Sequence, residues 1–201
     1  MSTDAIVQNY LEDAISSFRA YKKLAEKALA QLKDEEFFVT LDEEGNSIAV
    51  MMKHMAGNMH SRWTDFLTSD GEKPNRNRDM EFVIESDTTR DAIRDYWEQG
   101  WQTVFGALEP LTVADFDKTV QIRGEVHTIA QAINRQLTHY AYHVGQIVFL
   151  AKHFRATDWT SLTVPRNKSA EFNAHLAATP GRTADREKQF DAAASFAKEK
   201  E

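Results

Sequence analysis

The chain has 201 residues, and its 42% hydrophobic content with only eight glycines and four prolines fits one helical domain, with at most an appendage, rather than a disordered or all-β chain. A net charge of −7 repels phosphate backbones and argues against nucleic acid as a partner, while the lack of cysteine leaves histidine, carboxylate or amide groups to bind any metal. Because no apolar run approaches the roughly 20 residues of a membrane span and no signal-peptide core is present, we expect a cytoplasmic protein that does not bind membranes.

Two amphipathic helices are predicted in the first third of the chain. The first runs from about Asp4 to Lys33, and its apolar side chains recur at spacings of three and four, which indicates one buried face. After an acidic loop, Asn46 or Ser47 is expected to cap a second helix that runs to about Ser69.

The inner face of the second helix is rich in methionine, and core packing explains this most simply because flexible thioethers fill irregular gaps. His54 lies at one edge of this face, and Asn58 follows one turn later. Arg62 falls near the middle of the face, where an unpaired guanidinium would be costly. We therefore expect Arg62 to extend to solvent, to pair with a carboxylate or to line a polar pocket.

The middle of the chain contains a crossover and a third helix. Residues 70–79 are polar and rich in turn formers, so their charges are expected to be solvated. The third helix is predicted to start at Thr88, with Asp91 in a capping-box-like position, and to end at Pro110. Its apolar face carries large aromatic side chains, namely Trp97, Trp101 and Phe105. Because one chain need not cover all of them, they favour a homodimer.

A short extended segment precedes the last long helix. Residues 119–126 alternate weakly around Arg123–Gly124, which predicts a hairpin or an extended arm. Thr128 and Gln131 then form a capping box for a fourth helix that runs to about Phe154.

Four long amphipathic helices predict an all-α protein, a four-helix bundle with long connections and a short extended arm. We expect the bundle to span residues 1–156 and residues 157–201 to form a C-terminal segment, partly packed on the bundle and partly a mobile tail. Residues 180–201 are polar and rich in alanine, which predicts a mobile tail or a weakly docked terminal helix.

The fourth helix carries His139 and His143, four residues apart, so both imidazoles leave the same face. Two such groups can chelate a divalent metal if a third ligand comes from elsewhere in the fold. The pair alone is weak evidence, because it lacks the glutamate of the zinc-protease motif and ordinary core or surface histidines are the simpler interpretation. His54 strengthens the metal hypothesis, because it lies at the edge of a buried face in the same way.

Other polar residues near these histidines are candidates to line a pocket: Asn58, Arg62, Gln136, Tyr140 and Arg123. For each of them, ordinary packing or an exposed polar position is the simpler interpretation, because hydrogen-bonded polar side chains near a core are common. Serine-based catalysis is not indicated, since the chain has no nucleophile-elbow motif.

Two stretches of the sequence resemble motifs of the DinB/YfiT superfamily. Residues 47–58, SIAVMMKHMAGN, resemble its second-helix motif, and residues 137–146, LTHYAYHVGQ, resemble its late-helix motif. The segments SRWTDFL at 61–67 and DGEK at 70–73 resemble one uncharacterised branch of that superfamily. The likeness covers about residues 5–154.

This resemblance implies a DinB-like bundle, often a homodimer, that holds a divalent metal, commonly nickel or zinc. Three histidines bind the metal in that superfamily, and they match His54, His139 and His143. Characterised relatives include metal-dependent thiol S-transferases and isomerases that use low-molecular-weight thiols. The resemblance transfers no general base and no substrate-binding residue to this chain.

Two functions remain open at this point. The first is a metal-dependent transferase or hydrolase, in which a cation with an open coordination position activates a water or thiol nucleophile on a small-molecule substrate. The second is a non-catalytic metal-binding or stress-linked structural module, in which the ion stabilises the bundle. The negative surface disfavours a strongly anionic thiol unless Arg62 or Arg123 creates a local positive pocket.

Overall fold

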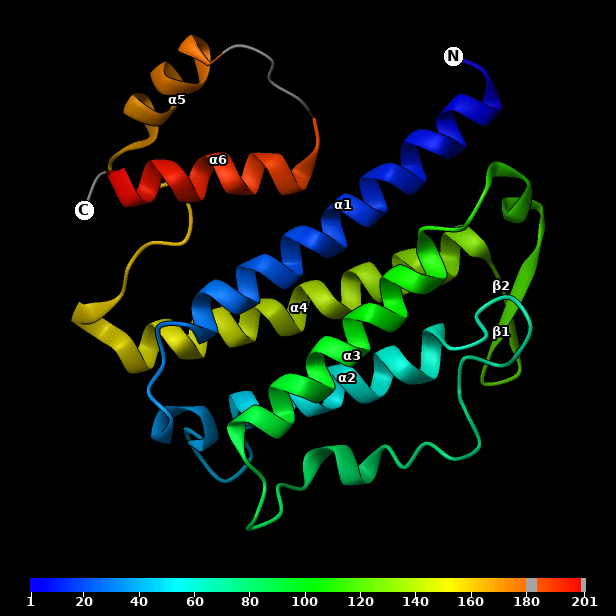
Figure 1. Ribbon diagram of the computed structural model, residues 1–201, viewed down its shortest axis with the longest axis horizontal. Coiled ribbons are helices and arrows are strands. Elements are labelled where there is room, and N and C mark those ends of the chain that lie inside the picture. The colour runs from blue at the N-terminus through cyan, green and yellow to red at the C-terminus, as the bar shows by residue number, and fades with distance from the viewer. Residues whose placement is uncertain (180–183, 200–201) are drawn as a thin grey trace. The chain divides into compact units, whose positions relative to one another are not determined.

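The computed structural model describes residues 1–179 and 184–199, most of which are helical (Figure 1). The elements are helices α1 (Thr3–Leu29), α2 (Ile48–Trp63), α3 (Arg90–Leu108), α4 (Ile129–Arg155), α5 (Ser169–Ala178) and α6 (Arg186–Glu199), and strands β1 (Thr119–Ile122) and β2 (Glu125–Thr128). The predicted helical class is confirmed. None of the helices in these described ranges combines the length and the apolar content needed to cross a membrane.

The chain folds as two compact units, each of which gathers distant parts of the sequence. The first unit comprises Met1–Ile15 and Lys33–His143, and the second comprises Ser16–Leu32 and Val144–Glu201. The first unit therefore contains α2, α3, the two strands and the first half of α4. The domain boundary expected at residue 156 stays a prediction.

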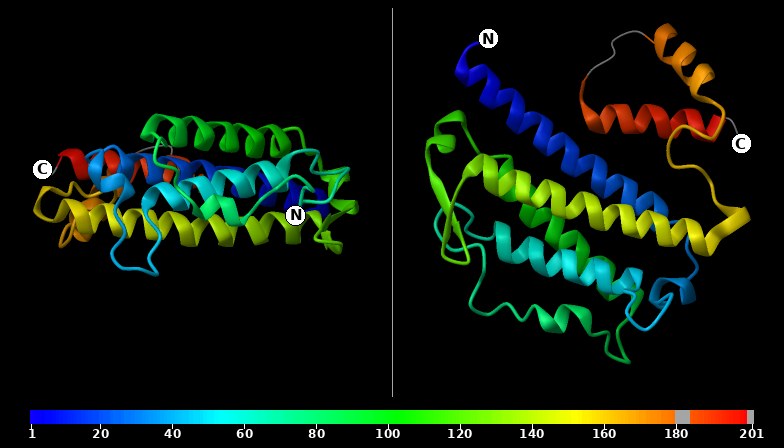
Figure 2. Two further views of the ribbon diagram at one scale, coloured as in Figure 1. Left: turned by 90° about the horizontal axis from the view of Figure 1, so that it is seen from below. Right: turned by 180° about the vertical axis from the view of Figure 1, so that it is seen from behind.

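Helix α2 is the most deeply buried helix of the first unit, and it runs beside α3 (Figure 2). The methionine stripe lies inside the core, as predicted, with Met52, Met55 and Met59 fully buried. Gly100 of α3 allows the close approach of the two helices, because a Cβ atom there would lie 3.0 Å from the sulfur of Met59 and 3.2 Å from Cα of Ala56. A larger residue at position 100 would therefore force the helices apart.

Several predicted helix starts and turns are confirmed by their hydrogen bonds. The Ser47 side chain accepts a bond from the third residue of α2 at 3.2 Å, and Thr128 and Gln131 exchange the two bonds of a capping box. Strands β1 and β2 pair antiparallel, and the turn residues Arg123 and Gly124 have φ values of 57° and 76°. Both residues are thus left-handed, as the commonest two-residue hairpin turn requires. The Asp70 carboxylate accepts hydrogen bonds from the backbone N–H groups of both turn residues.

Three predicted helix boundaries are wrong. Helix α1 ends at Leu29, four residues before the expected Lys33. Helix α2 ends at Trp63, not near Ser69, because Asp65 adopts a left-handed conformation with φ of 49°. Its carbonyl oxygen then accepts the N–H groups of residues 68 and 69 in a turn, although the apolar pattern continues past this point. Helix α3 begins one residue later than expected, since Thr89 rather than Thr88 caps it by accepting the N–H of residue 92.

The aromatic face of α3 is covered within the chain. Trp97 is 1% exposed and Trp101 is fully buried, while Phe105 is half-buried and stacks on Trp101. One chain thus covers both tryptophans and part of Phe105, so the tryptophans give no support to a homodimer. A homodimer remains a proposal that rests on the family resemblance alone.

The second unit contains α5 and α6, where the sequence indicated a tail. Phe190 and Phe196 of α6 are buried, and Lys23 of α1 pairs with Glu187 at 2.8 Å and with Asp191 at 2.6 Å. Helix α5 was not predicted, because its apolar residues lack a clear periodic face. Residues 180–183 and 200–201, part of the expected tail, lie outside the described residues.

A buried chain of hydrogen bonds connects α2 and α4 in the first unit. Nε1 of Trp63 donates to the hydroxyl oxygen of Tyr140 at 3.0 Å, and that hydroxyl donates to Oδ1 of Asn58 at 3.1 Å. Tyr140 is fully buried, and burial raises the pKa of its hydroxyl well above the usual value. The three groups fix how α4 faces α2, because each buried polar group satisfies its neighbour.

We predict that Tyr140→Phe destabilises the protein by about 1–3 kcal/mol, because it leaves the buried Trp63 and Asn58 groups without this shared partner. Urea unfolding followed by circular dichroism measures the change. Tyr142→Phe is the matched control, since Tyr142 lies on the same helix and is exposed; it should change stability by less than about 0.5 kcal/mol. Equal stability of the two variants would contradict the role assigned to this hydrogen-bond chain.

Candidate metal centre

Three histidine side chains converge in the first unit, and they are the three that the sequence singled out. His54 comes from α2, while His139 and His143 come from successive turns of α4. Nε2 of His139 lies 3.3 Å from Nε2 of His54 and 3.2 Å from Nε2 of His143. The potential ligand atoms of the three residues all lie within 4.8 Å of one another. His54 and His143 are buried, and His139 is half-buried.

The orientation of His54 is set by a carboxylate that the sequence analysis missed. Nδ1 of His54 bonds to Oε2 of Glu81 at 2.8 Å, and Glu81 is only 6% exposed. Arg76 holds the same carboxylate with two bonds, from Nε at 2.8 Å and from Nη2 at 2.9 Å. The fixed carboxylate points Nε2 of His54 toward the other two histidines, as carboxylates commonly do for metal-binding histidines.

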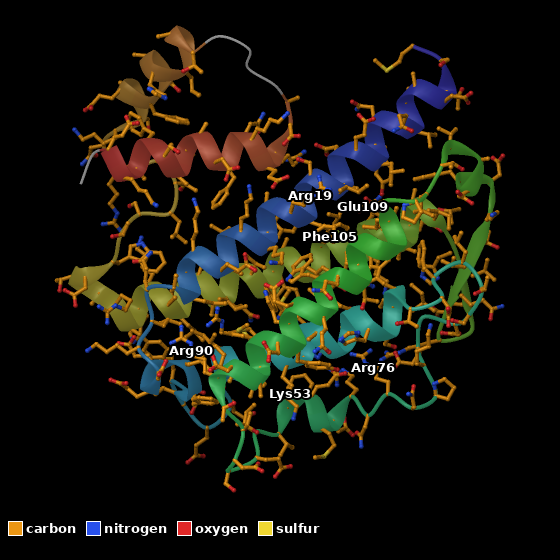
Figure 3. All side chains as sticks on the ribbon, viewed as in Figure 1. Arg19, Lys53, Arg76, Arg90, Phe105 and Glu109 are labelled. Atoms are coloured by element: carbon orange, nitrogen blue, oxygen red, sulfur yellow. The ribbon has the colours of Figure 1, made fainter. Side chains whose placement is uncertain are left out.

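Arg76 comes from the loop after α2 and is labelled in Figure 3. Its side chain is only 5% exposed, so the expectation that the charges of residues 70–79 are solvated is wrong for this residue. One signal in the sequence pointed here: Gly57 lies within α2, three residues after His54, and glycine inside a helix indicates a close approach. A Cβ atom at Gly57 would lie 2.3 Å from Oε1 of Glu81.

The electrostatic environment favours the ionised form of Glu81 and the neutral form of His139. Burial disfavours the charged form of Glu81, but hydrogen bonds from His54 and Arg76 outweigh it and hold the pKa of Glu81 below its usual value. Burial, followed by the neighbouring His143 and His54, lowers the pKa of His139 to about 3. His139 is therefore neutral near pH 7, which is the form that binds metals.

Hydrogen bonds between neutral rings cannot account for both short contacts of His139, the one with His54 and the one with His143. The ionised Glu81 can only accept, so the proton of its bond lies on Nδ1 of His54, and Nε2 of a neutral His54 carries a lone pair. Nε2 of His139 holds at most one proton, and that proton can point along only one of the two contacts. A cation bound to all three Nε2 lone pairs satisfies them together.

The spacing of the three rings also fits a metal ion. Nitrogen ligands held about 2.0–2.1 Å from a tetrahedral ion lie about 3.3–3.4 Å from one another. The two separations from Nε2 of His139, 3.2 Å to His143 and 3.3 Å to His54, agree with this value, and all the potential ligand atoms lie within 4.8 Å of one another. The donor set of three imidazoles, with one ring fixed by a carboxylate, therefore fits a divalent transition-metal ion.

A cavity of about 430 Å³ adjoins the centre, and it is lined by residues of the first unit only. His54 and His139 line it, together with three of the pocket candidates: Asn58, Arg62 and Gln136. Arg123 also lines this cavity, whereas Tyr140 is not among the lining residues and lies in the buried hydrogen-bond chain. Arg62 pairs with Glu72 at 2.9 Å, which is one of the three arrangements expected for it.

The remaining histidines lie outside the cluster. Nδ1 of His60 is 3.1 Å from the Thr103 hydroxyl, and Nδ1 of His127 is 2.9 Å from the carbonyl oxygen of Glu125. His153 and His175 are exposed. The geometry therefore distinguishes three of the seven histidines from the rest, within the part of the chain that the structure describes.

We predict that Gly57→Ala destabilises the protein even though alanine favours helix by about 1 kcal/mol. The added methyl group overlaps the Glu81 carboxylate, and overpacking of this kind typically costs about 1–3 kcal/mol. Gly106→Ala on α3 is the control, because nothing lies within 4 Å of a Cβ atom there; it should raise stability. Chemical denaturation of both variants provides the comparison, and a stabilised Gly57→Ala protein would contradict the close packing of Glu81.

Comparison with known proteins supports a family assignment. A search of curated proteins and a search of solved structures each found no match. A family model described as a protein of unknown function, DUF1572, matches residues 5–168. The matched region contains α2, α3, α4 and all three clustered histidines. Because the match spans most of the chain, the protein belongs to the DUF1572 family.

Proposed function

We propose that His54, His139 and His143 bind one divalent cation and that the protein is a metal-dependent enzyme of the DinB/YfiT type. In this proposal α1 to α4 correspond to the four-helix bundle of that superfamily. The observation that carries the proposal is the convergence of three imidazoles beside a cavity, with Nε2 of His139 3.3 Å from Nε2 of His54 and 3.2 Å from Nε2 of His143. Nickel and zinc are the proposed ions, since both accept a set of imidazole ligands.

The residues of this chain prepare the site in two ways. Glu81 fixes the ring of His54 through Nδ1, so that a bound ion would need little rearrangement of that ligand. Three neutral ligands would leave the ion with its full positive charge. When bound, such an ion supplies Lewis-acid activation of a water or of a thiol.

The position of the cavity favours an enzyme over a structural metal module. His54 and His139 line the cavity, so a small molecule there would lie next to two of the three ligands. A structural site is closed by four protein ligands, whereas the cluster among the described residues contains three. We therefore propose a transferase or hydrolase that acts on a small molecule, with a low-molecular-weight thiol as one possible nucleophile. The alternative remains a module in which the ion only stabilises the fold.

Metal content is the first test. Protein purified without a histidine tag should contain one divalent ion per chain, and His139→Ala should lose most of it. His153→Ala, an exposed histidine of the same helix, should retain the wild-type content. Glu81→Gln should lower metal affinity by about 10–100-fold, because the partner that orients His54 becomes weaker. Equal metal content in wild type and His139→Ala would refute the assignment.

Turnover is the second test, and it separates the two proposed functions. Metal-loaded protein should transfer a thiol to an electrophilic acceptor or hydrolyse an ester or amide, and replacing all three histidines should abolish that turnover. If the loaded protein turns over none of these substrates while the metal raises its unfolding temperature, the structural module is the better explanation. Activity that survives loss of all three histidines would contradict a metal-dependent reaction.

A further inference from the structure

The cavity beside the histidines is lined by an unusual number of arginines for a chain of net charge −7. Five guanidinium groups surround it: Arg62, Arg76, Arg78, Arg123 and Arg135. No carboxylate is among its lining residues. The local charge around the cavity is therefore opposite in sign to the charge of the chain as a whole.

Two of these arginines are buried and are held in place by ion pairs. Nη2 of Arg62 lies 2.9 Å from Oε2 of Glu72, and Nη1 donates to the carbonyl oxygen of Gly71. Arg76 is bound to Glu81 and also lies 3.3 Å from Oε2 of Glu72. Fixed guanidinium groups of this kind form a rigid, positively charged wall.

The carboxylates that contact the five arginines are too few to neutralise them. Oε2 of Glu72 accepts from Arg62, from Arg76 and from Nε of the exposed Arg123 at 3.1 Å. Of the five arginines, Arg76 is the one that donates hydrogen bonds to Glu81. Asp70 adds a third carboxylate, because it accepts from the backbone N–H of Arg123 and interacts with the charge of Arg62. The five positive charges thus meet three carboxylates, which leaves two positive charges in excess.

Arg78 and Arg135 are exposed at this cavity and have no ion-pair partner among the described residues. The guanidinium of Arg78 lies over the Phe82 ring, 4.9 Å from its centre. Exposed arginines are often only solvated, and a network that merely stabilised the loop would need carboxylates to match its charge. Here the unmatched groups gather around one concave site, where a bound anion would offset their mutual repulsion.

The polar lining of the cavity is also incompletely satisfied by the protein. Gln136 is buried and lines the cavity, and its Oε1 atom has no hydrogen-bond partner among the described residues. A buried amide oxygen without a partner is costly, and a hydrogen-bond donor on a molecule in the cavity would satisfy it, as in small-molecule sites with a few convergent polar groups. A volume of about 430 Å³ is within the range of small-molecule sites.

We propose that this cavity binds a small molecule through a doubly negative group, a phosphate or a dicarboxylate, that lies against the arginines. Guanidinium groups bind both kinds of oxyanion with paired hydrogen bonds. The anionic end of the molecule would lie at Arg78 and Arg135, and its other end would reach the cavity wall formed by His54 and His139. As a statement about the substrate, this inference rests on the proposed metalloenzyme; the binding of the anion can be measured without the metal.

Isothermal titration of metal-free protein with inorganic phosphate and, separately, with succinate tests the proposal at constant ionic strength. Arg78→Gln and Arg135→Gln remove one exposed cavity charge each. Arg94→Gln on α3 is the matched control, because its side chain is 63% exposed and Arg94 does not line the cavity. Thermal unfolding verifies that all three variants fold as the wild type does.

We expect saturable binding of at least one probe, weakened about fivefold or more by each cavity variant, the loss expected for one exposed charge-assisted hydrogen bond. Arg94→Gln should bind as the wild type does, and the probe that binds more tightly identifies the anionic group. Absence of binding by both probes, or an equal loss in Arg94→Gln, would overturn the proposal. Because the protein is metal-free, these results do not depend on whether the histidines bind a metal.

Discussion

The candidate centre depends on one buried ion pair, the Glu81 carboxylate held by Arg76 with bonds of 2.8 and 2.9 Å. Removing one partner of such a pair leaves an uncompensated buried charge, which typically costs about 3–5 kcal/mol. Because His54 bonds to the same carboxylate, the ion pair also fixes the position of the histidine ring. The loop that carries Arg76 and Glu81 is thereby part of the site, although neither residue is a candidate metal ligand.

A second constraint places the remaining two histidines. Tyr140 lies next to His139 in sequence, and its buried hydroxyl accepts a hydrogen bond from Trp63 and donates one to Asn58, both on α2. Since the histidines follow the rotation of α4, fixing Tyr140 against α2 also turns His139 and His143 toward His54. The packing of α4 against α2 therefore determines both the apolar core around Tyr140 and the histidine cluster beside it.

The charge around the cavity is opposite in sign to the net charge of the chain. A chain of net charge −7 would repel an anionic substrate over most of its surface, yet five arginines line the cavity beside the histidines. The Glu72 carboxylate accepts hydrogen bonds from three of these guanidinium groups and holds them close together. Solvent screens distant charges, so the potential in the cavity depends mainly on the charged groups close to it. The cavity can therefore be positive although the chain as a whole is negative.

The sequence by itself determined the four long helices, the caps at Ser47 and Thr128, the hairpin at Arg123–Gly124 and the His139–His143 pair, because periodicity, capping and spacing are local properties. His54 joined that pair through its place at the edge of a buried face and through the family resemblance. It did not determine the end of α2, where Asp65 turns left-handed within a continuing apolar pattern, or the covering of Trp97 and Trp101 by their own chain. Only the tertiary structure decided that Glu81 supports His54 and that arginines from α2, the loop after it, the hairpin turn and α4 surround one cavity. His54 and Glu81 are 27 positions apart and Arg62 and Arg135 are 73 apart, and they come together through packing and long-range ion pairs that no local pattern encodes.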